Sequence, residues 1–240
     1  MSAGQRVGDA WEQVSTVAPA PSLGLVVLAA GIAAAMVLAP GAWPRTRHLV
    51  TIAHEGAHGV AALLTGRRLS GIRLHSDTSG LTVSRGRPSG PGMVLTSAAG
   101  YLGPGLMGLG AAYLLHVGHA VGVLWLALFL LAALLLQIRN FYGLYAVLVV
   151  GVAVFAFSWW ASPPVQVLVA HVGTWFVLLA APRAVVELQV HRRRGHARTS
   201  DADTLARLTG VPGLVWVALF LVVNVGALVV GGGWLLAASG

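Results

Sequence analysis

Cysteine is absent from the 240 residues, and charged residues make up only 9% of them. Without cysteine, neither a disulfide framework nor a thiolate zinc site is possible, so any metal must be held by His, Asp or Glu. An ordinary soluble domain carries roughly 25% charged residues. With 57% hydrophobic residues and a mean hydropathy of +0.80, this chain is too poor in charge to face water on every side. Most of its surface is expected to face lipid.

Lysine is absent as well, so all 15 basic residues are arginine, and the net charge is +8 with a pI of 11.4. A nucleic-acid binder gathers basic residues on one folded face among polar and aromatic side chains. Here they lie in short segments between apolar runs, as they do in the cytoplasmic loops of membrane proteins. The pattern predicts a lipid bilayer as partner and no nucleic acid.

Seven apolar runs approach the roughly 20 residues that a membrane-spanning helix needs. The second run is the weakest, because His, Glu, Thr and Gly interrupt it. We expect an all-α polytopic membrane protein of about seven transmembrane helices. A single membrane domain, residues 23–240, follows a cytoplasmic tail, residues 1–22. The seven runs are residues 23–40, 47–65, 93–115, 120–137, 142–161, 165–187 and 212–236.

The arginines predict the orientation. If the seven runs alternate across the membrane, twelve arginines fall on the side of the N-terminus and only Arg45 and Arg47 on the other. The positive-inside rule then places the N-terminus in the cytoplasm and the C-terminus outside. The exclusive use of arginine and the richness in alanine and glycine suggest a GC-rich bacterial genome, and hence a bacterial inner membrane.

Two segments outside the apolar runs have structure of their own. In residues 70–85, apolar and polar residues alternate on either side of a Ser-Asp-Thr-Ser-Gly turn, which predicts a small cytoplasmic β-hairpin. The hairpin is either a clamp that binds an extended substrate by strand addition or a passive connector. In the cytoplasmic loop 188–211, Ser200 and Asp203 form a capping-box pattern that predicts a short amphipathic helix over 200–209.

The chemistry-bearing motif is residues 54–58, which read His-Glu-Gly-Ala-His. On a helix, positions i and i+4 project from the same face, so His54 and His58 can bind one Zn²⁺ together. The carboxylate of Glu55, beside the first histidine, can serve as general base toward a water molecule. An unpaired carboxylate near mid-span costs at least ~2.5 kcal/mol, which favours a functional reason for Glu55.

This motif and several softer ones follow one another in an order that resembles the site-2 protease family of intramembrane zinc metallopeptidases, in particular a divergent bacterial and plant branch. The resemblance covers about residues 45–236. It implies that His54 and His58 are zinc ligands, that Glu55 is the general base, and that the substrates are membrane proteins or membrane peptides cleaved in or beside transmembrane helices. The softer motifs are the hairpin, Gly100-Tyr101-Leu102-Gly103-Pro104 and Ser200-Asp201-Ala202-Asp203.

The third metal ligand is where the sequence departs from that family, because its Asn-x-x-Pro-x-x-x-x-Asp-Gly motif is absent. Apart from Glu55, only Glu187 among the acids lies within or at the edge of an apolar run, which makes Glu187 the first candidate. A helical ion pair with Arg183, four residues earlier, accounts for Glu187 equally well. Asp201 is the second candidate, since it already has a capping role, and His171 is the third.

Asn140 is a candidate for holding the substrate backbone or the oxyanion, although it also stands where a helix cap is expected. Two other functions compete with a protease. One is a catalytically inactive, protease-like membrane scaffold. The other is a metal or proton transporter, which usually has two related halves with paired broken helices. No such internal symmetry is evident in the sequence.

Overall fold

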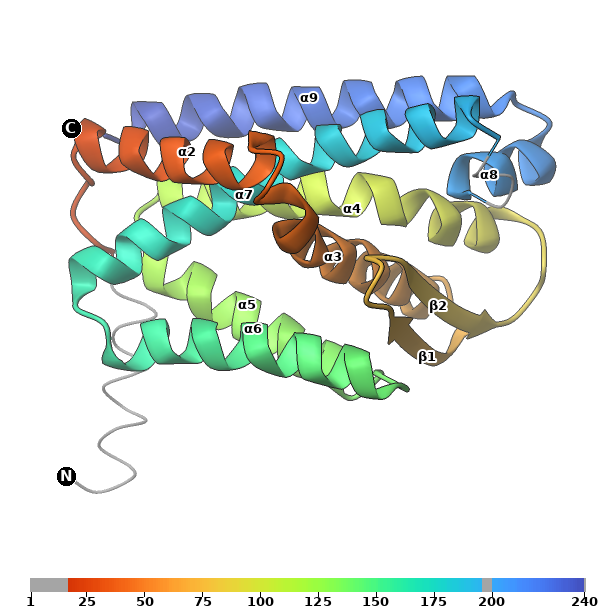
Figure 1. Cartoon of the computed structure of the whole chain (residues 1–240), viewed down its shortest axis with the longest axis horizontal. Coiled ribbons are helices and arrows are strands. Elements are labelled where there is room, and N and C mark those ends of the chain that lie inside the picture. Colours follow the sequence, from red (N-terminus) through yellow and green to blue (C-terminus); the bar gives the residue numbers. More distant parts are fainter. Residues whose placement is uncertain (1–16, 196–199, 240) are drawn as a thin grey trace.

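The computed structural model describes residues 17–195 and 200–239, and in this part of the chain it contains eight helices and one two-stranded sheet (Figure 1). The all-α class with a small β-hairpin is confirmed. The elements are α2 (Leu23–Leu38), α3 (Trp43–Leu64), β1 (Arg68–Leu74), β2 (Gly80–Arg85), α4 (Pro91–His116), α5 (Ala120–Leu135), α6 (Phe141–Trp160), α7 (Pro163–Arg193), α8 (Asp201–Thr209) and α9 (Gly213–Ala237).

Each of the seven apolar runs forms a helix, but the count of seven membrane spans needs correction. Within the described residues, four helices are long and apolar enough to cross a membrane: α4, α6, α7 and α9. The helices α2 and α3 pass the same test only together, as one bent pair, so the number of spans is up to five if that pair counts as one. The 16 residues of α5 reach about 24 Å, short of a ~30 Å hydrocarbon core.

The bend between α2 and α3 is 100°. It falls at Pro40-Gly41, where proline cannot continue a helix. Because α2 ends inside the bundle, its last carbonyl groups need new hydrogen-bond donors. The hydroxyl of Thr46 donates to the carbonyl of Met36 at 2.8 Å, and the guanidinium of Arg183 on α7 donates to the carbonyl of Val37. These bonds fix the angle at which α3 enters the molecule.

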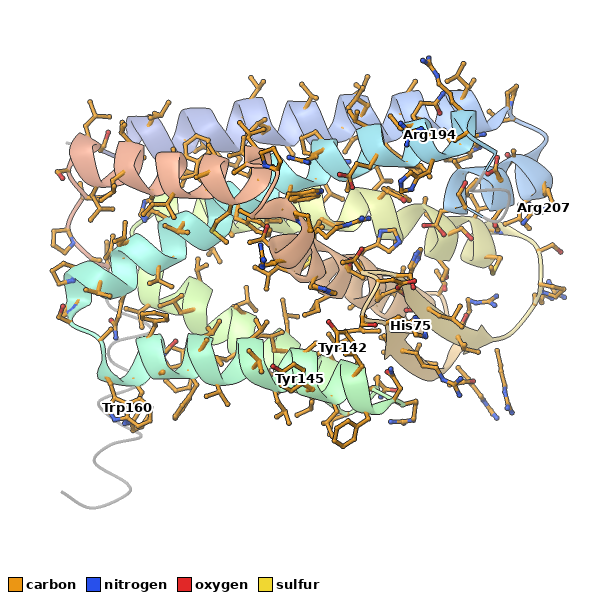
Figure 2. All side chains as sticks on the ribbon, viewed as in Figure 1. His75, Tyr142, Tyr145, Trp160, Arg194 and Arg207 are labelled. Atoms are coloured by element: carbon orange, nitrogen blue, oxygen red, sulfur yellow. The ribbon has the colours of Figure 1, made fainter. Side chains whose placement is uncertain are left out.

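The bend changes which segments share an end of the molecule. The amide of Ala18 donates to the carbonyl of Gly118 at 2.9 Å, so the start of α2 lies beside the α4–α5 connection. The hairpin, the α5–α6 connection and α8 lie at the opposite end of α4 (Figure 1). Figure 2 places Arg194 and Arg207 at this hairpin end and Trp160 at the other. The start of α2 and the hairpin therefore lie at opposite ends of α4, whereas seven simple spans would place the N-terminal segment and the hairpin on one side.

Glycines allow α4 to approach its neighbours α3, α7 and α9 closely. A Cβ atom at Gly103 would lie 2.2 Å from the Cβ of Ala57, and one at Gly108 would lie 2.9 Å from the Cδ2 of Leu178. Small residues bring helix backbones together in membrane proteins, where close packing replaces the hydrophobic effect as the force between helices. This packing holds the face of α4 directly against the His-Glu motif on α3.

The hairpin predicted over 70–85 is confirmed, with β1 and β2 antiparallel and Ile72 opposite Thr82. The other edge of β1 is also bonded, because the amide of Ile72 donates to the carbonyl of Gln137 at 2.8 Å. In the turn, the hydroxyl and the amide of Ser79 donate to the carboxylate of Asp77, and these bonds hold the pKa of Asp77 below its ordinary value. The hairpin is thus tied to the bundle along β1 and rests on α3 through β2.

Candidate metal centre

The two histidines of the motif lie one turn apart on α3, as their spacing predicts. The imidazole rings of His54 and His58 meet edge to face, with centroids 4.7 Å apart and an interplanar angle of 87°. Their Nε2 atoms are 3.1 Å apart. Both rings therefore direct the same nitrogen toward a common point.

The orientation of the rings is set by α4. The Nδ1 atom of His58 lies 2.6 Å from the carbonyl oxygen of Thr96, so Nδ1–H donates to this carbonyl and leaves the lone pair of Nε2 for a metal. At Gly100 a Cβ atom would lie 2.3 Å from Nε2 of His58 and 2.6 Å from Cε1 of His54. Only glycine at this position lets α4 cover both imidazoles.

A carboxylate from α8 completes the group. The Oδ2 atom of Asp201 lies 3.2 Å from Nε2 of His54 and 3.3 Å from Nε2 of His58. Three donors bound to one zinc ion at 2.0–2.2 Å with tetrahedral angles would lie about 3.3–3.6 Å apart. The observed separations differ from this by a few tenths of an ångström, and two imidazoles with one carboxylate are ligands that zinc accepts. The donor set therefore fits zinc.

The position of Asp201 depends on its neighbours at the start of α8. Ser200 caps the helix by accepting a hydrogen bond from the amide of Asp203 at 3.3 Å, and its own hydroxyl donates to the Asp203 carboxylate at 2.6 Å. Arg192 at the end of α7 donates to the same carboxylate at 2.7 Å. Since Ser200 caps the helix and Asp203 binds Ser200 and Arg192, Asp201 is free to turn toward the histidines.

The charge state of Asp201 suits a ligand. Burial raises the pKa of its carboxyl group, but without a metal, when the histidines carry protons on Nε2, the charge of His58 and the hydrogen bonds from both histidines outweigh burial and hold this pKa well below its ordinary value. The carboxylate is therefore ionised at neutral pH, as a metal ligand must be.

Glu187, the first candidate for the third ligand, lines the cavity described below but does not belong to the group of close donor atoms, so its predicted role is corrected to a structural one. Its Oε1 accepts a hydrogen bond of 2.5 Å from the indole of Trp43, and its carboxylate also meets Arg183 and Arg47, each at 3.5 Å. It thus anchors the start of α3 to α7. Among the described residues, the one group of three potential ligands with mutually close donor atoms is His54, His58 and Asp201.

His171, the third candidate, does not reach the metal group. It is 1% exposed in the helix-packed core, and its Nδ1 lies 2.8 Å from the carbonyl oxygen of Val167, one turn earlier on α7. This is the interaction of a helix-packing histidine.

Glu55 is 4% exposed and lies against the first residues of β2. The hydroxyl of Thr82 donates to its Oε2 at 2.6 Å. A Cβ atom at Gly80 would lie 2.5 Å from Oε1 of Glu55, so the hairpin approaches the carboxylate as closely as a backbone can. The hairpin thereby holds one carboxylate oxygen and fixes the orientation of the other.

A cavity of about 300 Å³ opens beside this group. It lies between α3, α4, α7 and the hairpin turn, and polar side chains line much of its wall. Water can therefore reach His54 and Glu55 although the helices around them are apolar. The residues that line it include Arg47, Thr51, His54, Glu55, Ser79, Gly100, Tyr101, Glu187, His191 and Ser200.

Asn140, the candidate for the oxyanion or the substrate backbone, uses its carboxamide to hold the hairpin. Its Oδ1 accepts from the amide of Leu74 at 3.1 Å, and its Nδ2 donates to the carbonyl of Leu74 at 2.6 Å. The carboxamide thus forms the pair of hydrogen bonds with the backbone of Leu74 that a neighbouring strand would form at the end of β1. Both of its polar atoms are occupied, so the expectation of a role in the site is replaced by a structural one.

Comparison with known families gives one match: a family model described as Peptidase M50B-like covers residues 27–231. This range begins within α2, ends within α9 and includes every element between them. The comparisons with curated proteins and with solved structures give no match.

Proposed function

Because the chain belongs to the Peptidase M50B-like family, which is the site-2 protease family, we propose that it is an intramembrane zinc metalloprotease. It hydrolyses peptide bonds in or next to the transmembrane segments of other proteins. The observation that carries this proposal is the triangle of donor atoms from His54, His58 and Asp201, with sides of 3.1–3.3 Å, next to the buried Glu55.

His54, His58 and Asp201 would hold the metal, and Glu55 would act as general base. Zinc bound there supplies a Lewis acid that lowers the pKa of water from 15.7 to about 7 and polarises a carbonyl. Asp201 is the only charged ligand of the three. The carbonyl of Thr96 keeps His58 in the tautomer that binds metal.

Glu55 carries the proton through the reaction. One carboxylate oxygen is held by Thr82, and the other accepts a proton from a water molecule as the water oxygen bonds to the carbonyl carbon of the substrate. The carbonyl π electrons move onto its oxygen, and when they return the C–N bond breaks. The protonated Glu55 then gives its proton to the departing amine, which regenerates the carboxylate.

A substrate segment must be unwound before it can react, because a hydrogen-bonded helix shields its carbonyl groups. The hairpin supports an extended substrate. Its strand β1 is bonded on both edges within the described residues, whereas β2 begins at the cavity beside Glu55. A substrate added along β2 would therefore enter the cavity in strand conformation.

The orientation follows from the arginines at the hairpin end. We place this end in the cytoplasm, because the loops there carry the arginine-rich segments 67–87 and 192–194. The start of α2 and the end of α9 then lie on the outer side of what we propose is a bacterial inner membrane. We thus propose the outer side for the start of α2, which differs from the cytoplasmic side expected from seven simple spans.

The decisive experiment compares the wild-type chain with Glu55→Gln after each is reconstituted with zinc in liposomes. A panel of single-span peptides with helix-destabilising residues at different depths is added, and products are identified by mass spectrometry. We expect zinc content to be unchanged in Glu55→Gln and cleavage to stop. The variant Glu12→Gln, the same substitution outside the described residues, is the matched control. Cleavage that continues in Glu55→Gln, or a wild-type chain that binds no zinc, overturns the proposal.

A further inference from the structure

Tyr101 is a polar side chain in the cavity for which the reaction above has no use. It follows Gly100 on α4, and its ring meets that of His54 edge to face, with centroids 4.7 Å apart. The ring of Phe220 on α9 stacks on it at 5.4 Å, with the two planes only 19° apart. A metal-binding histidine and a buried phenylalanine thus fix the position of the phenol.

Tyr101 lines the cavity, and its hydroxyl group forms no hydrogen bond with another residue in the described part of the chain, whereas the carbonyl of the same residue accepts one from Asn224. A tyrosine hydroxyl in a protein interior usually has a partner. The charged groups that act on this phenol include Asp201 and Glu55, which places it within the field of the site. It is a donor without an acceptor beside reacting groups.

The reaction described above assigns no hydrogen-bond donor to the substrate. When water bonds to the peptide carbonyl, negative charge gathers on the carbonyl oxygen, and hydrogen-bond donors fixed in place stabilise that charge. Asn140 does not fill this role, because both polar atoms of its carboxamide bind Leu74. Tyr101 lines the same cavity as Glu55 and His54, and its ring is held on both sides.

We propose that Tyr101 is a further catalytic residue, whose hydroxyl group donates a hydrogen bond to the carbonyl oxygen of the scissile peptide bond as this oxygen becomes an oxyanion. The inference rests on the proposed peptidase function. No proton is transferred: the phenol keeps its hydrogen, the bond shortens as the charge grows, and it weakens again when the C–N bond breaks. Because the bond strengthens in the transition state, it raises kcat rather than substrate affinity.

The variant Tyr101→Phe distinguishes a catalytic role of the hydroxyl group from a packing role of the ring. It keeps the ring contacts with His54 and Phe220 and removes only the hydroxyl group. The matched control is Tyr113→Phe on the same helix. That tyrosine is 52% exposed, and its ring packs against Trp234 at the far end of α4 from the metal group.

The test uses the peptide that the wild-type chain cleaves and a phosphinic analogue of its scissile bond, which imitates the tetrahedral oxyanion. For Tyr101→Phe we expect kcat to fall about 10²-fold or more. The KM, the zinc content and the thermal unfolding midpoint stay at the values of Tyr113→Phe. Affinity for the phosphinic analogue should fall by a factor similar to that for kcat, a readout that packing alone would not move.

Three outcomes overturn the inference. The first is a Tyr101→Phe variant with kcat and analogue affinity within about threefold of wild type. The second is a loss of zinc in this variant, which would make the phenol a support for His54. The third is an increase in KM alone. Failure of the peptidase proposal is recognised separately, because the wild-type chain then binds no zinc, or Glu55→Gln continues to cleave, whatever Tyr101→Phe does.

Discussion

Replacing Asp201 by asparagine removes the one charged ligand from the proposed zinc site while keeping the size of the side chain. The donor triangle would stay in place, because Ser200, Asp203 and Arg192 hold the start of α8 without help from Asp201. The oxygen facing His54 and His58 becomes that of a neutral amide, which binds zinc poorly. We therefore expect the fold to be kept and zinc affinity to fall.

The size of the loss follows from what the side chain contacts. Partners that only orient a ligand typically contribute 10–100-fold to metal affinity. Asp201 lies 3.2 and 3.3 Å from the two Nε2 atoms, as a direct ligand would. Its removal should exceed that range and reach about 10³-fold, or roughly 4 kcal/mol at 1.4 kcal/mol per decade.

The assay is a competition titration of the detergent-solubilised chain with a chromophoric zinc chelator, repeated with Co²⁺ to follow the visible spectrum of the site. Glu187→Gln is the matched control. Its affinity should stay within about threefold of wild type, because Glu187 binds Trp43 and the arginines rather than the metal group. A variant Asp201→Asn with wild-type zinc affinity, or a Glu187→Gln variant that loses zinc, would refute the reasoning.

Three further predictions concern the hairpin. Gly80→Ala puts a methyl group 2.5 Å from Oε1 of Glu55. Because this displaces the carboxylate of the general base, kcat should fall about 10²-fold at unchanged zinc content. A variant with wild-type kcat would contradict the close approach of Gly80 to Glu55. Asn140→Ala should lower the free energy of unfolding by about 1–3 kcal/mol in chemical denaturation, while kcat per zinc-loaded molecule falls less than about tenfold; a loss of 10²–10³-fold would restore its oxyanion role. Because the pKa of Asp77 is below its unfolded value of about 3.9, the turn is stabilised above that pH and loses this stabilisation as pH falls through the folded pKa. A nitroxide spin label is attached at Leu81→Cys, which supplies the only cysteine of the chain. The label should become more mobile below about pH 4, and Asp77→Ala should abolish this pH dependence. If the label responds to pH equally with and without Asp77, then Asp77 is not the cause.

Much of the fold could be predicted from local pattern. Each apolar run forms a helix, and the alternation in 70–85 forms the hairpin, because backbone groups in an apolar environment must satisfy one another locally. The number of passages could not be read in this way. Whether Pro40-Gly41 separates two spans or bends one depends on Arg183 and Thr46, which cap the end of α2 from elsewhere in the chain.

The site likewise has one part that the local sequence predicts and one part that it does not. The spacing of His54 and His58 predicts their common direction, since both lie on one helix. The third member comes from α8, far away in the sequence, where the capping box gives the only local signal for it. The capping box needs Ser200 and Asp203 only, so an acid between them, Asp201, had no local task.

The most direct test of the central claim is hydrolysis in water enriched in ¹⁸O. The zinc-loaded chain in liposomes is given a cleavable single-span peptide, and the two fragments are weighed by mass spectrometry. We predict one ¹⁸O atom in the new terminal carboxylate of the amino-terminal fragment, none in the other fragment, and no fragments from Glu55→Gln. Fragments without ¹⁸O, or labelled fragments formed equally by Glu55→Gln, would contradict a peptidase in which Glu55 activates water beside His54, His58 and Asp201.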